Sequence, residues 1–349
     1  MEDYILSDRE KSILRSVIHQ FILTANPVGS RNIAKKNDLG LSPATIRNIM
    51  ADLEDSGFLN HPHTSAGRLP TDRGYRFYVD SLMDPPVIEE TKKDFITAEM
   101  NSFYSETDDL LKLTASLLSE LTSQLACVTF PKFENSILTS IQLVQLSSTR
   151  LLVVVSIKSG LVKTITLEVD TEISSENIIA VQKFLNEKLS GLTFTEIRKT
   201  LKERIQDIPK ENYRPIVRVF LESVDKIFQD SHIQDKSYLT GAKNILSQPE
   251  FGGQDKFKGI IELIEDKDII IHIMDKVKSS GNNVSIIIGE ETMESKFSDF
   301  SMITKEYQVG GATGTVGIMG PKRMEYSRMI ATVVYIAEQL SLGFKKISL

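Results

Sequence analysis

The sequence predicts an α+β protein of several domains: an N-terminal winged helix-turn-helix, an antiparallel sheet domain, and a mostly helical insertion within that sheet domain. At 349 residues, the chain exceeds the roughly 250 to 300 residues at which one hydrophobic core usually stops growing. The first eighty residues carry short helical patterns separated by turns. Further along, two blocks of β-branched and aliphatic residues flank a helical stretch, residues 174–229.

The first predicted helix begins at Ser7, because Ser7 and Glu10 have the spacing of a capping box. Apolar residues then recur at helical spacing up to Ile22, and Asn26-Pro27 ends the pattern. Ser30 is expected to cap a short second helix, and Leu39-Gly40-Leu41 supplies a turn of helix-turn-helix length.

The third helix carries the clearest signals. Ser42 is a good N-cap, and Pro43 sits at the first helical position, where its missing N–H costs nothing. Gly57 is suited to the C-terminal end. The buried face is expected to consist of four apolar residues at helical spacing: Ile46, Ile49, Met50 and Leu53.

This helix has an asymmetric polar face. Thr45, Arg47 and Asn48 point outward from its first two turns, while the last turn carries Asp52, Glu54 and Asp55. A recognition helix presents its N-terminal residues to base edges, and phosphates repel carboxylates, so this order favours base contact by Thr45, Arg47 and Asn48. The alternative is a small three-helix packing unit with a polar surface.

The segment after this helix, residues 61–70, is small, polar and rich in turn formers, as in the loop of a wing. Predicted wing contacts are His63, Thr64, Ser65, Gly67 and Arg68, with Arg68 suited to a narrow minor groove. Predicted phosphate contacts are Arg31, Lys35, Lys36, Ser42, Arg73 and Arg76. The alternative for Arg73 and Arg76 is ordinary solvated surface.

The overall charge opposes DNA binding, but the local charge does not. The chain has a net charge of -6, whereas a DNA-binding domain usually carries a basic footprint. Between Ser30 and Val79, seven basic side chains face five acidic ones, a local net charge of +2. The acidity belongs mainly to the rest of the chain.

After the N-terminal helices, Asp84-Pro85-Pro86 is expected to form a linker, followed by a long leucine-rich helix. Strands are predicted at residues 137–146, 151–157 and 162–169, and again at 284–289, 302–309 and 315–319. The simplest topology places both blocks in one sheet domain, interrupted by helices. The last helix, with apolar residues from Met329 to Leu340, is wide enough on its apolar face to cover the sheet.

Three separated motifs resemble the heat-inducible transcription repressor family of bacteria, usually called HrcA. They are LSPATIRNIMADLEDSGFLNHPHTSAGRLPTDRGYRFYVD at 41–80, NILSQPEF at 244–251 and GTVGIMGPKRMEYSRMI at 314–330. The chain departs from the family's usual residues at Ser247, Lys322 and Glu325, which puts only local packing or partner contacts in doubt.

The resemblance implies a homodimeric repressor of chaperone operons that binds double-stranded DNA at an inverted-repeat operator, with activity modulated by the chaperonin. It also implies a GAF-like sheet domain with an inserted dimerisation domain. We therefore expect a winged helix-turn-helix at 1–84, the GAF-like domain at 85–172 and 256–349, and the inserted domain at 173–255.

The sequence gives little support for nucleotide binding, metal binding or catalysis. The glycine-rich run 310–317 lacks the spacing of a phosphate loop, and a hairpin turn is expected instead. The histidines are too few and scattered for a metal site, and no nucleophile motif indicates an enzyme, so neither metal, catalytic residues nor cofactor is predicted. The main rival is a metabolite sensor, since GAF-like domains often bind small molecules; an enclosed apolar cavity would favour it.

The composition and the first residues of the sequence indicate the cellular compartment. Apolar residues make up 41 % of the chain, and no run approaches the ~18 apolar residues of a membrane span, so no membrane association is expected. The first six residues are acidic where an export signal would be basic, which favours a cytoplasmic protein. The single cysteine, Cys127, lies in an apolar stretch and is expected in the core.

Overall fold

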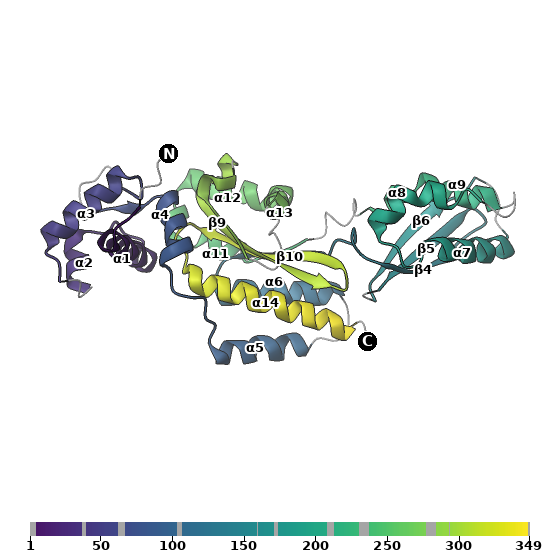
Figure 1. The fold of residues 1–349 in the computed structure, drawn as a ribbon, viewed down its shortest axis with the longest axis horizontal. Helices are drawn as coiled ribbons and strands as arrows, with labels where there is room; N and C mark the ends of the chain where they lie inside the picture. Colours follow the sequence, from purple (N-terminus) through teal and green to yellow (C-terminus); the bar gives the residue numbers. More distant parts are fainter. Residues whose placement is uncertain are drawn as a thin grey trace.

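The computed structural model describes residues 5–36, 40–61, 67–102, 107–158, 160–170, 174–207, 213–229, 237–276, 284–292 and 294–347. Three bodies follow one another along the long axis of the molecule (Figure 1). An N-terminal domain lies at one end, a central domain with a five-stranded sheet lies in the middle, and an inserted domain with a three-stranded sheet lies at the other end. The secondary structure is therefore a mixture of helices and antiparallel sheets.

The N-terminal domain is a small helical unit with one short hairpin. Its elements are α1 (Asp8–Thr24), α2 (Ser30–Lys36), α3 (Pro43–Asp55), β1 (Leu59–Asn60), β2 (Leu69–Pro70), α4 (Asp72–Phe77) and a π-helical turn (Tyr78–Leu82). The predicted capping box is confirmed, since Ser7 and Glu10 bond reciprocally at the start of α1. Ile13, Ile33 and Ile46 of the first three helices are fully or almost fully buried and form part of one core.

The central domain is built on a sheet with the strand order β7-β3-β10-β9-β8, in which all neighbours are antiparallel. Its strands are β3 (Leu125–Thr129), β7 (Ser237–Thr240), β8 (Ser285–Ile288), β9 (Phe300–Val309) and β10 (Ala312–Pro321). The predicted hairpin is confirmed, because β9 and β10 pair along their whole length across Gly310 and Gly311. Both glycines have positive φ, which side chains disfavour.

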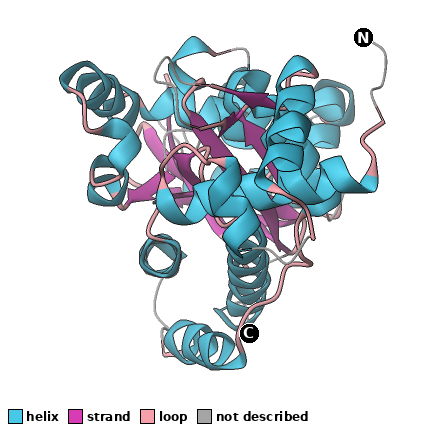
Figure 2. Cartoon of the chain, turned by 90° about the vertical axis from the view of Figure 1, so that its left-hand side faces the viewer, coloured by secondary structure: helices cyan, strands magenta, loops and turns pink. Residues whose placement is uncertain are grey.

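Helices cover both faces of this sheet, so its strands lie in the interior (Figure 2). One face packs on α6 (Thr107–Thr122) and α14 (Tyr326–Ile347), with α5 (Glu90–Asn101) outside them. The other packs on α11 (Ala242–Leu246), α12 (Gln254–Glu265) and α13 (Lys267–Lys276), with short 3₁₀ turns at Pro249–Phe251, Gly289–Thr292 and Ser295–Phe297. Strand β3 is therefore buried on both sides, and Cys127 is in the core as predicted.

The inserted domain corrects the predicted topology. Strands β4 (Leu138–Gln145), β5 (Arg150–Ile157) and β6 (Val162–Glu168) pair only with one another in the described residues. They share the domain with α7 (Ser175–Leu189), α8 (Phe194–Arg204), α9 (Arg214–Glu222) and α10 (Val224–Phe228). Placing this strand block in the central sheet was wrong, because consecutive antiparallel strands close locally and bury alternate side chains under their own helices.

The domain boundaries change accordingly. The chain leaves the central sheet after Thr129 and returns at Ser237, two residues that lie opposite each other in the β3–β7 pair. The insertion therefore lies between these two positions and is α/β rather than mostly helical, in contrast to the predicted 173–255. The segment from Ser237 to Phe251, predicted as part of the insertion, belongs to the central domain.

Candidate nucleic-acid interface

Helix α3 presents its predicted polar face to solvent. The Ser42 hydroxyl accepts a hydrogen bond from the Thr45 N–H at 3.1 Å, and Pro43 occupies the first turn, so the helix begins where the sequence signals place it. Ile46, Met50 and Leu53 are buried, and this orientation leaves Thr45, Arg47 and Asn48 exposed. The predicted asymmetry of the helix therefore holds in three dimensions.

The acidic end of α3 is partly neutralised within the chain. The Glu54 carboxylate lies 2.7 Å from Nε of Arg68 and also contacts the His61 ring. The side chain of Arg68 is 27 % exposed, so it lies beside α3 instead of extending into solvent. Sequence reasoning placed Arg68 in the wing but did not predict this partner, because the contact depends on how the hairpin returns to the helix.

At the base of the predicted wing, three short segments form a small sheet. Val28 and Arg68 exchange two backbone hydrogen bonds of 2.9 Å, while β1 pairs with β2. Gly67 is required here, since a Cβ at this position would lie 2.7 Å from the carbonyl carbon of Pro27. The predicted contacts His63, Thr64 and Ser65 lie outside the described residues.

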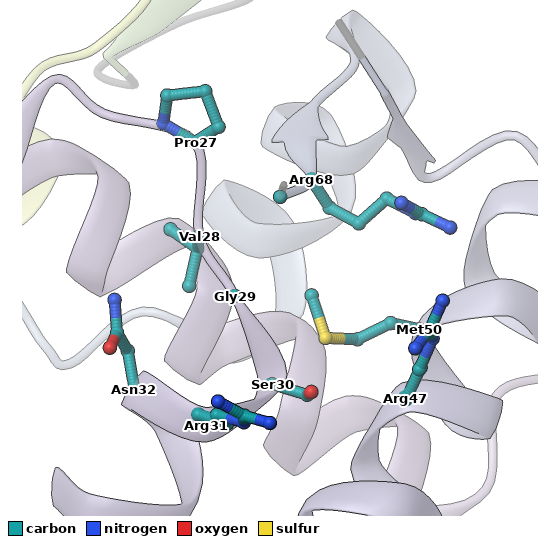
Figure 3. A pocket seen from close by; sticks show the side chains of 10 residues that line it. Pro27, Val28, Gly29, Ser30, Arg31, Asn32, Arg47, Met50 and Arg68 are labelled. Atoms are coloured by element: carbon teal, nitrogen blue, oxygen red, sulfur yellow. The ribbon is translucent and has the colours of Figure 1, made fainter. Parts of the chain in front are cut away.

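An open groove of about 530 Å³ runs between the start of α2, the exposed face of α3 and the base of the wing (Figure 3). Arg31, Arg47 and Arg68 line it from three different segments, and no carboxylate is among its lining residues. Its volume is that of a small-molecule site, but such sites are mostly apolar, whereas this groove is polar and cationic. A polar groove lined by arginines suits the negatively charged phosphate backbone of a nucleic acid.

The other predicted phosphate contacts divide into two groups. Arg31 lines the groove, Lys35 and Ser42 are exposed but are not among its lining residues, and the Lys36 side chain lies outside the described residues. Arg73 instead lies 4.5 Å from the centroid of the Phe58 ring and donates a hydrogen bond to the Ser56 carbonyl. The structure thus brings Arg31 to the groove and holds Arg73 against Phe58 and Ser56.

Arg76 contacts the central domain. Its guanidinium donates to both carboxylate oxygens of Glu291, at 2.7 and 2.5 Å, and lies 3.3 Å from Asp80. The hydrogen bond to Glu291 is the main reason that the pKa of Arg76 is raised above its usual value. Glu291 is 215 residues away in sequence, so no local signal could have revealed this contact.

Alternative sites have little support in the part of the chain that the structure describes. No group of three or more potential metal ligands comes together there, and no helix is long and apolar enough to cross a membrane. One open pocket of about 140 Å³ lies between Phe251, Ile260 and Phe300 in the central domain. It is smaller than the roughly 300 to 1,000 Å³ of typical small-molecule sites, so it does not favour a metabolite sensor.

Comparison with known proteins decides the family. Residues 108–330 match the family model described as HrcA protein C terminal domain. The heat-inducible transcription repressor HrcA of Chlorobium phaeobacteroides (strain BS1) is 41 % identical, covering 96 % of this chain and 97 % of the relative. That of Prosthecochloris aestuarii is 39 % identical over the full length of both proteins.

The chain belongs to the HrcA family of heat-inducible transcription repressors. The HrcA relatives are named as repressors, a regulatory role and not an enzymatic one, in agreement with the sequence prediction. A solved structure titled only as a hypothetical protein at 2.2 Å resolution has the same fold, with a TM-score of 0.59, 23 % identity, and coverage of 98 % of this chain and 99 % of that one.

The HrcA motifs separate into two locations. In the described residues, the first covers α3, the β1–β2 pair and α4. The second, residues 244–251, and the third, residues 314–330, lie far apart in sequence but meet next to the N-terminal domain. Arg323 contacts the Glu250 carboxylate and donates to the Ile22 carbonyl at 2.7 Å. Sequence reasoning did not assign a contact to either residue.

Proposed function

We propose that this chain is a sequence-specific DNA-binding repressor of heat-shock chaperone operons, which binds an inverted-repeat operator as a homodimer through a winged helix-turn-helix. The observation that carries this proposal is the exposed N-terminal face of α3 beside a groove lined by arginines. Family membership supports the repressor role.

In this proposal the N-terminal turns of α3 enter the major groove. Thr45, Arg47 and Asn48 contact base edges, where arginine pairs with guanine and asparagine with adenine. The proposed phosphate contacts are Arg31, which lines the groove, Lys35 and Lys36, which follow its lining residues along the chain, and Ser42, which is exposed before α3. Arg73 and Arg76 are left out, because both already have partners within the chain.

The wing is proposed to follow an adjacent groove of the DNA. His63, Thr64 and Ser65 would form its contact surface, with Gly67 allowing the close approach to Pro27. In the free protein Arg68 is held by Glu54, and on the operator it is proposed to contact the DNA instead. Glu54→Gln weakens this attraction but also removes a negative charge, so only a gain in DNA affinity that is lost when Arg68 is replaced by alanine would show that Arg68 moves from α3 to the DNA.

We propose that the inserted domain dimerises through the uncovered face of its sheet. Buried side chains such as Val153 and Val155 face the domain's own helices, and the alternate residues face away from them. On that outer face, Val144 is 44 % and Val162 is 54 % exposed. An inverted repeat requires a two-fold symmetric partner, and a second copy of this sheet would bury these side chains.

The central domain is proposed to be the GAF-like domain and to serve as a scaffold. Its sheet is enclosed by helices. The proposed link to the chaperonin rests on the family resemblance. It predicts that added chaperonin raises the fraction of repressor that is competent to bind the operator, without contacting DNA itself.

The test is fluorescence anisotropy of the purified chain with a chaperone-operon promoter fragment and with a scrambled fragment of equal length, across several salt concentrations. Binding to the promoter at least ~1,000-fold tighter supports operator recognition. A parallel series includes purified chaperonin. Equal, purely salt-driven binding to both fragments in both series would contradict the proposal.

A further inference from the structure

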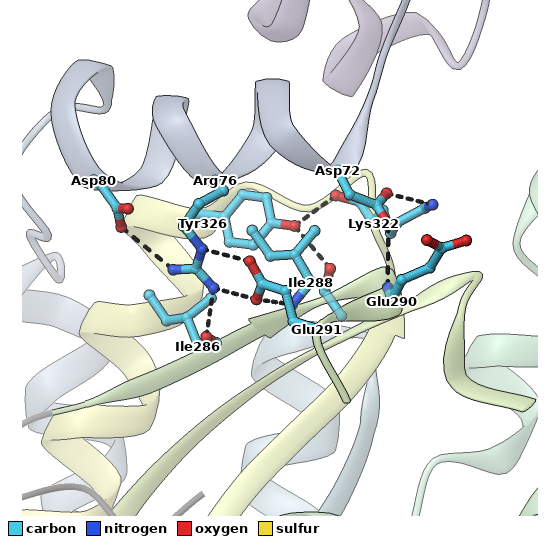
Figure 4. A network of polar contacts seen from close by, with 10 residues as sticks. Asp72, Arg76, Asp80, Ile286, Ile288, Glu290, Glu291, Lys322 and Tyr326 are labelled. Carbon is cyan, nitrogen blue, oxygen red and sulfur yellow. Dashed lines mark hydrogen bonds and ion pairs between the residues drawn. The ribbon is translucent and has the colours of Figure 1, made fainter. Parts of the chain in front are cut away.

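The contact between the N-terminal and central domains is made largely by charged side chains (Figure 4). We call it the joint and define it by six residues, of which two come from α4 and four from the central domain. They are Asp72, Arg76, Glu250, Glu291, Lys322 and Arg323. The proposed DNA-binding function uses none of them.

Arg76 attaches α4 to the edge of the central sheet. Besides Glu291, its guanidinium donates a 2.7 Å hydrogen bond to the carbonyl of Ile286 in the edge strand β8. The Glu291 carboxylate also accepts the Ile288 N–H at 2.8 Å, so the ion pair is oriented by the strand itself. Arg76 of the N-terminal domain thus pairs with the Glu291 carboxylate and also donates a hydrogen bond to the Ile286 carbonyl, both in the central domain.

Asp72 makes a second attachment at the start of α4. Its carboxylate accepts hydrogen bonds from Nζ of Lys322 at 2.5 Å and from the Glu290 N–H at 3.1 Å. Gly289, with φ of +56°, leaves room for this carboxylate, since a Cβ there would lie 2.0 Å from Asp72 Oδ2. The backbone of the central domain is therefore shaped to admit Asp72.

Arg323 makes a third attachment, at the C-terminal end of α1. Its side chain is only 15 % exposed, and it connects the Ile22 carbonyl with Glu250. Between the attachments, the buried rings of Tyr75 and Tyr326 pack with their centroids 6.1 Å apart. Three separated polar attachments around an apolar centre restrict rotation of one domain on the other, which a single contact would not.

We propose that the joint holds the N-terminal domain at one orientation and so determines which half-site spacing the repressor dimer accepts. This inference rests on the proposed function. In a dimer joined through its inserted domains, the separation of the two α3 helices depends on how each N-terminal domain is oriented. One helical turn of DNA is 10 to 10.5 base pairs, or about 34 to 36 Å, so a half-turn change of spacing moves one half-site to the opposite face of the duplex.

The first experiment measures orientation without DNA. Spin labels are attached at Asp55→Cys on α3 and Glu338→Cys on α14, both exposed positions, with Cys127 replaced by alanine. With doubly labelled chain diluted in excess unlabelled chain, so that distances between subunits do not contribute, we expect pulsed electron resonance to give a narrow distance distribution in the otherwise unchanged chain. The double variant Lys322→Met/Glu291→Gln should give a broad one, and a narrow distribution in that variant would overturn the proposal.

The second experiment measures spacing preference. The probes are the inverted repeat that wild-type protein protects in the chaperone-operon promoter, the same repeat lengthened by half a helical turn, and a duplex with one half-site. We expect the double variant to lose about ten-fold of the wild-type preference for the natural spacing while its affinity for the single half-site stays unchanged. An unchanged preference would overturn the proposal.

Two further variants separate the joint from general destabilisation. Lys93→Met is the matched control: its ion pair with Glu90 lies within α5, and its side chain is 33 % exposed against 29 % for Lys322. It should leave both readouts unchanged. Gly289→Ala disturbs the joint sterically with no change of charge and should reproduce the broad distribution; a narrow one there would count against the proposed role of Asp72.

These outcomes are distinct from failure of the proposed function. If the wild-type chain binds no promoter sequence specifically, the repressor proposal fails, while the distance measurement still tests the joint. Loss of half-site affinity in the double variant would make Lys322 and Glu291 necessary for DNA binding or domain folding, and would overturn their assignment as positioning residues.

Discussion

Arginine has three different environments around the N-terminal domain. Arg47 is exposed on α3, Arg73 lies against the Phe58 ring, and Arg76 forms an ion pair with the central domain. The planar guanidinium suits all three, since it can contact a base edge, stack on an aromatic ring or bind a carboxylate through two nitrogens. Helical position distinguishes Arg47 from the others, but only the folded chain supplies the partners of Arg73 and Arg76.

Arg47→Ala tests base contact. We expect a loss of roughly 1 to 3 kcal/mol in operator binding, together with relaxed specificity at one operator position, because a bidentate base contact disappears. The measurement is competition binding against operators with each position substituted in turn. Lys35→Ala is the control and should weaken binding to all sequences alike and lower the salt dependence. A uniform loss for Arg47→Ala would make Arg47 a phosphate contact.

Tyr307 provides a prediction on pH. Burial raises the pKa of its hydroxyl well above 10, and the hydroxyl donates a 2.7 Å hydrogen bond to the Thr129 carbonyl. At neutral pH, Tyr307→Phe should lower the free energy of unfolding by about 1 kcal/mol. Above pH ~10 the unfolded tyrosine ionises while the folded one stays protonated, so wild-type stability falls as pH rises.

The difference between wild type and Tyr307→Phe should therefore shrink between pH 8 and pH 11. Urea unfolding followed by circular dichroism at several pH values measures it. A difference that stays constant over this range would mean that the Tyr307 hydroxyl ionises equally in the folded and unfolded chains.

At the scale of elements, short-range signals place the ends of α1 and α3 and the β9–β10 turn correctly. The capping box at Ser7, the cap at Ser42 and the glycines at 310 and 311 act within a few residues of themselves. The sheet to which strands β4, β5 and β6 belong was predicted wrongly, since β-branched runs indicate strands but do not identify their neighbours.

Ser42 should contribute to the stability of α3 through its cap. Ser42→Ala removes the acceptor for the Thr45 N–H and should cost about 1 kcal/mol, whereas Ser42→Gly should cost only a few tenths. Amide hydrogen exchange of the first turn of α3 measures the change. Equal protection in the alanine variant and the wild type would mean that the cap does not stabilise the helix.

Two glycines should respond to alanine in opposite directions. A Cβ at Gly314 would lie 2.4 Å from the Tyr307 ring across the β9–β10 pair, so Gly314→Ala should destabilise the central domain by about 1 to 3 kcal/mol. Gly259 is exposed within α12, with no atom near its Cβ position, and Gly259→Ala should stabilise by about 0.5 to 1 kcal/mol. Thermal unfolding of both variants tests this, and equal shifts would refute it.

At the scale of the whole molecule, the inserted domain is connected to the central sheet through two adjacent strands, β3 and β7. Because Thr129 and Ser237 are paired neighbours, a short hairpin loop can replace residues 131–235 without separating β3 from β7. The shortened chain should fold, sediment as a monomer and bind a single half-site, but lose the extra affinity for the full inverted repeat. Sedimentation velocity and anisotropy measure these properties.

Point substitutions provide the control for this deletion. Val144→Lys/Val162→Lys places charges on the uncovered sheet face, where both side chains are already exposed, so the fold should remain while the dimer dissociates. A dimer that persists in both the deletion and the double lysine variant would mean that the chain dimerises through another surface.

Local chemistry in the chain was sufficient to predict the α+β class, the helices of the N-terminal domain, the polar face of α3 and the family. These depend on periodicity, caps and turns, whose interactions span about one helical turn. The extent of the insertion, the partner of Arg68 and the joint required the folded chain. Lys322 meets Asp72 across 250 residues, and Arg323 meets Ile22 across 301, contacts that arise only when separate segments pack together.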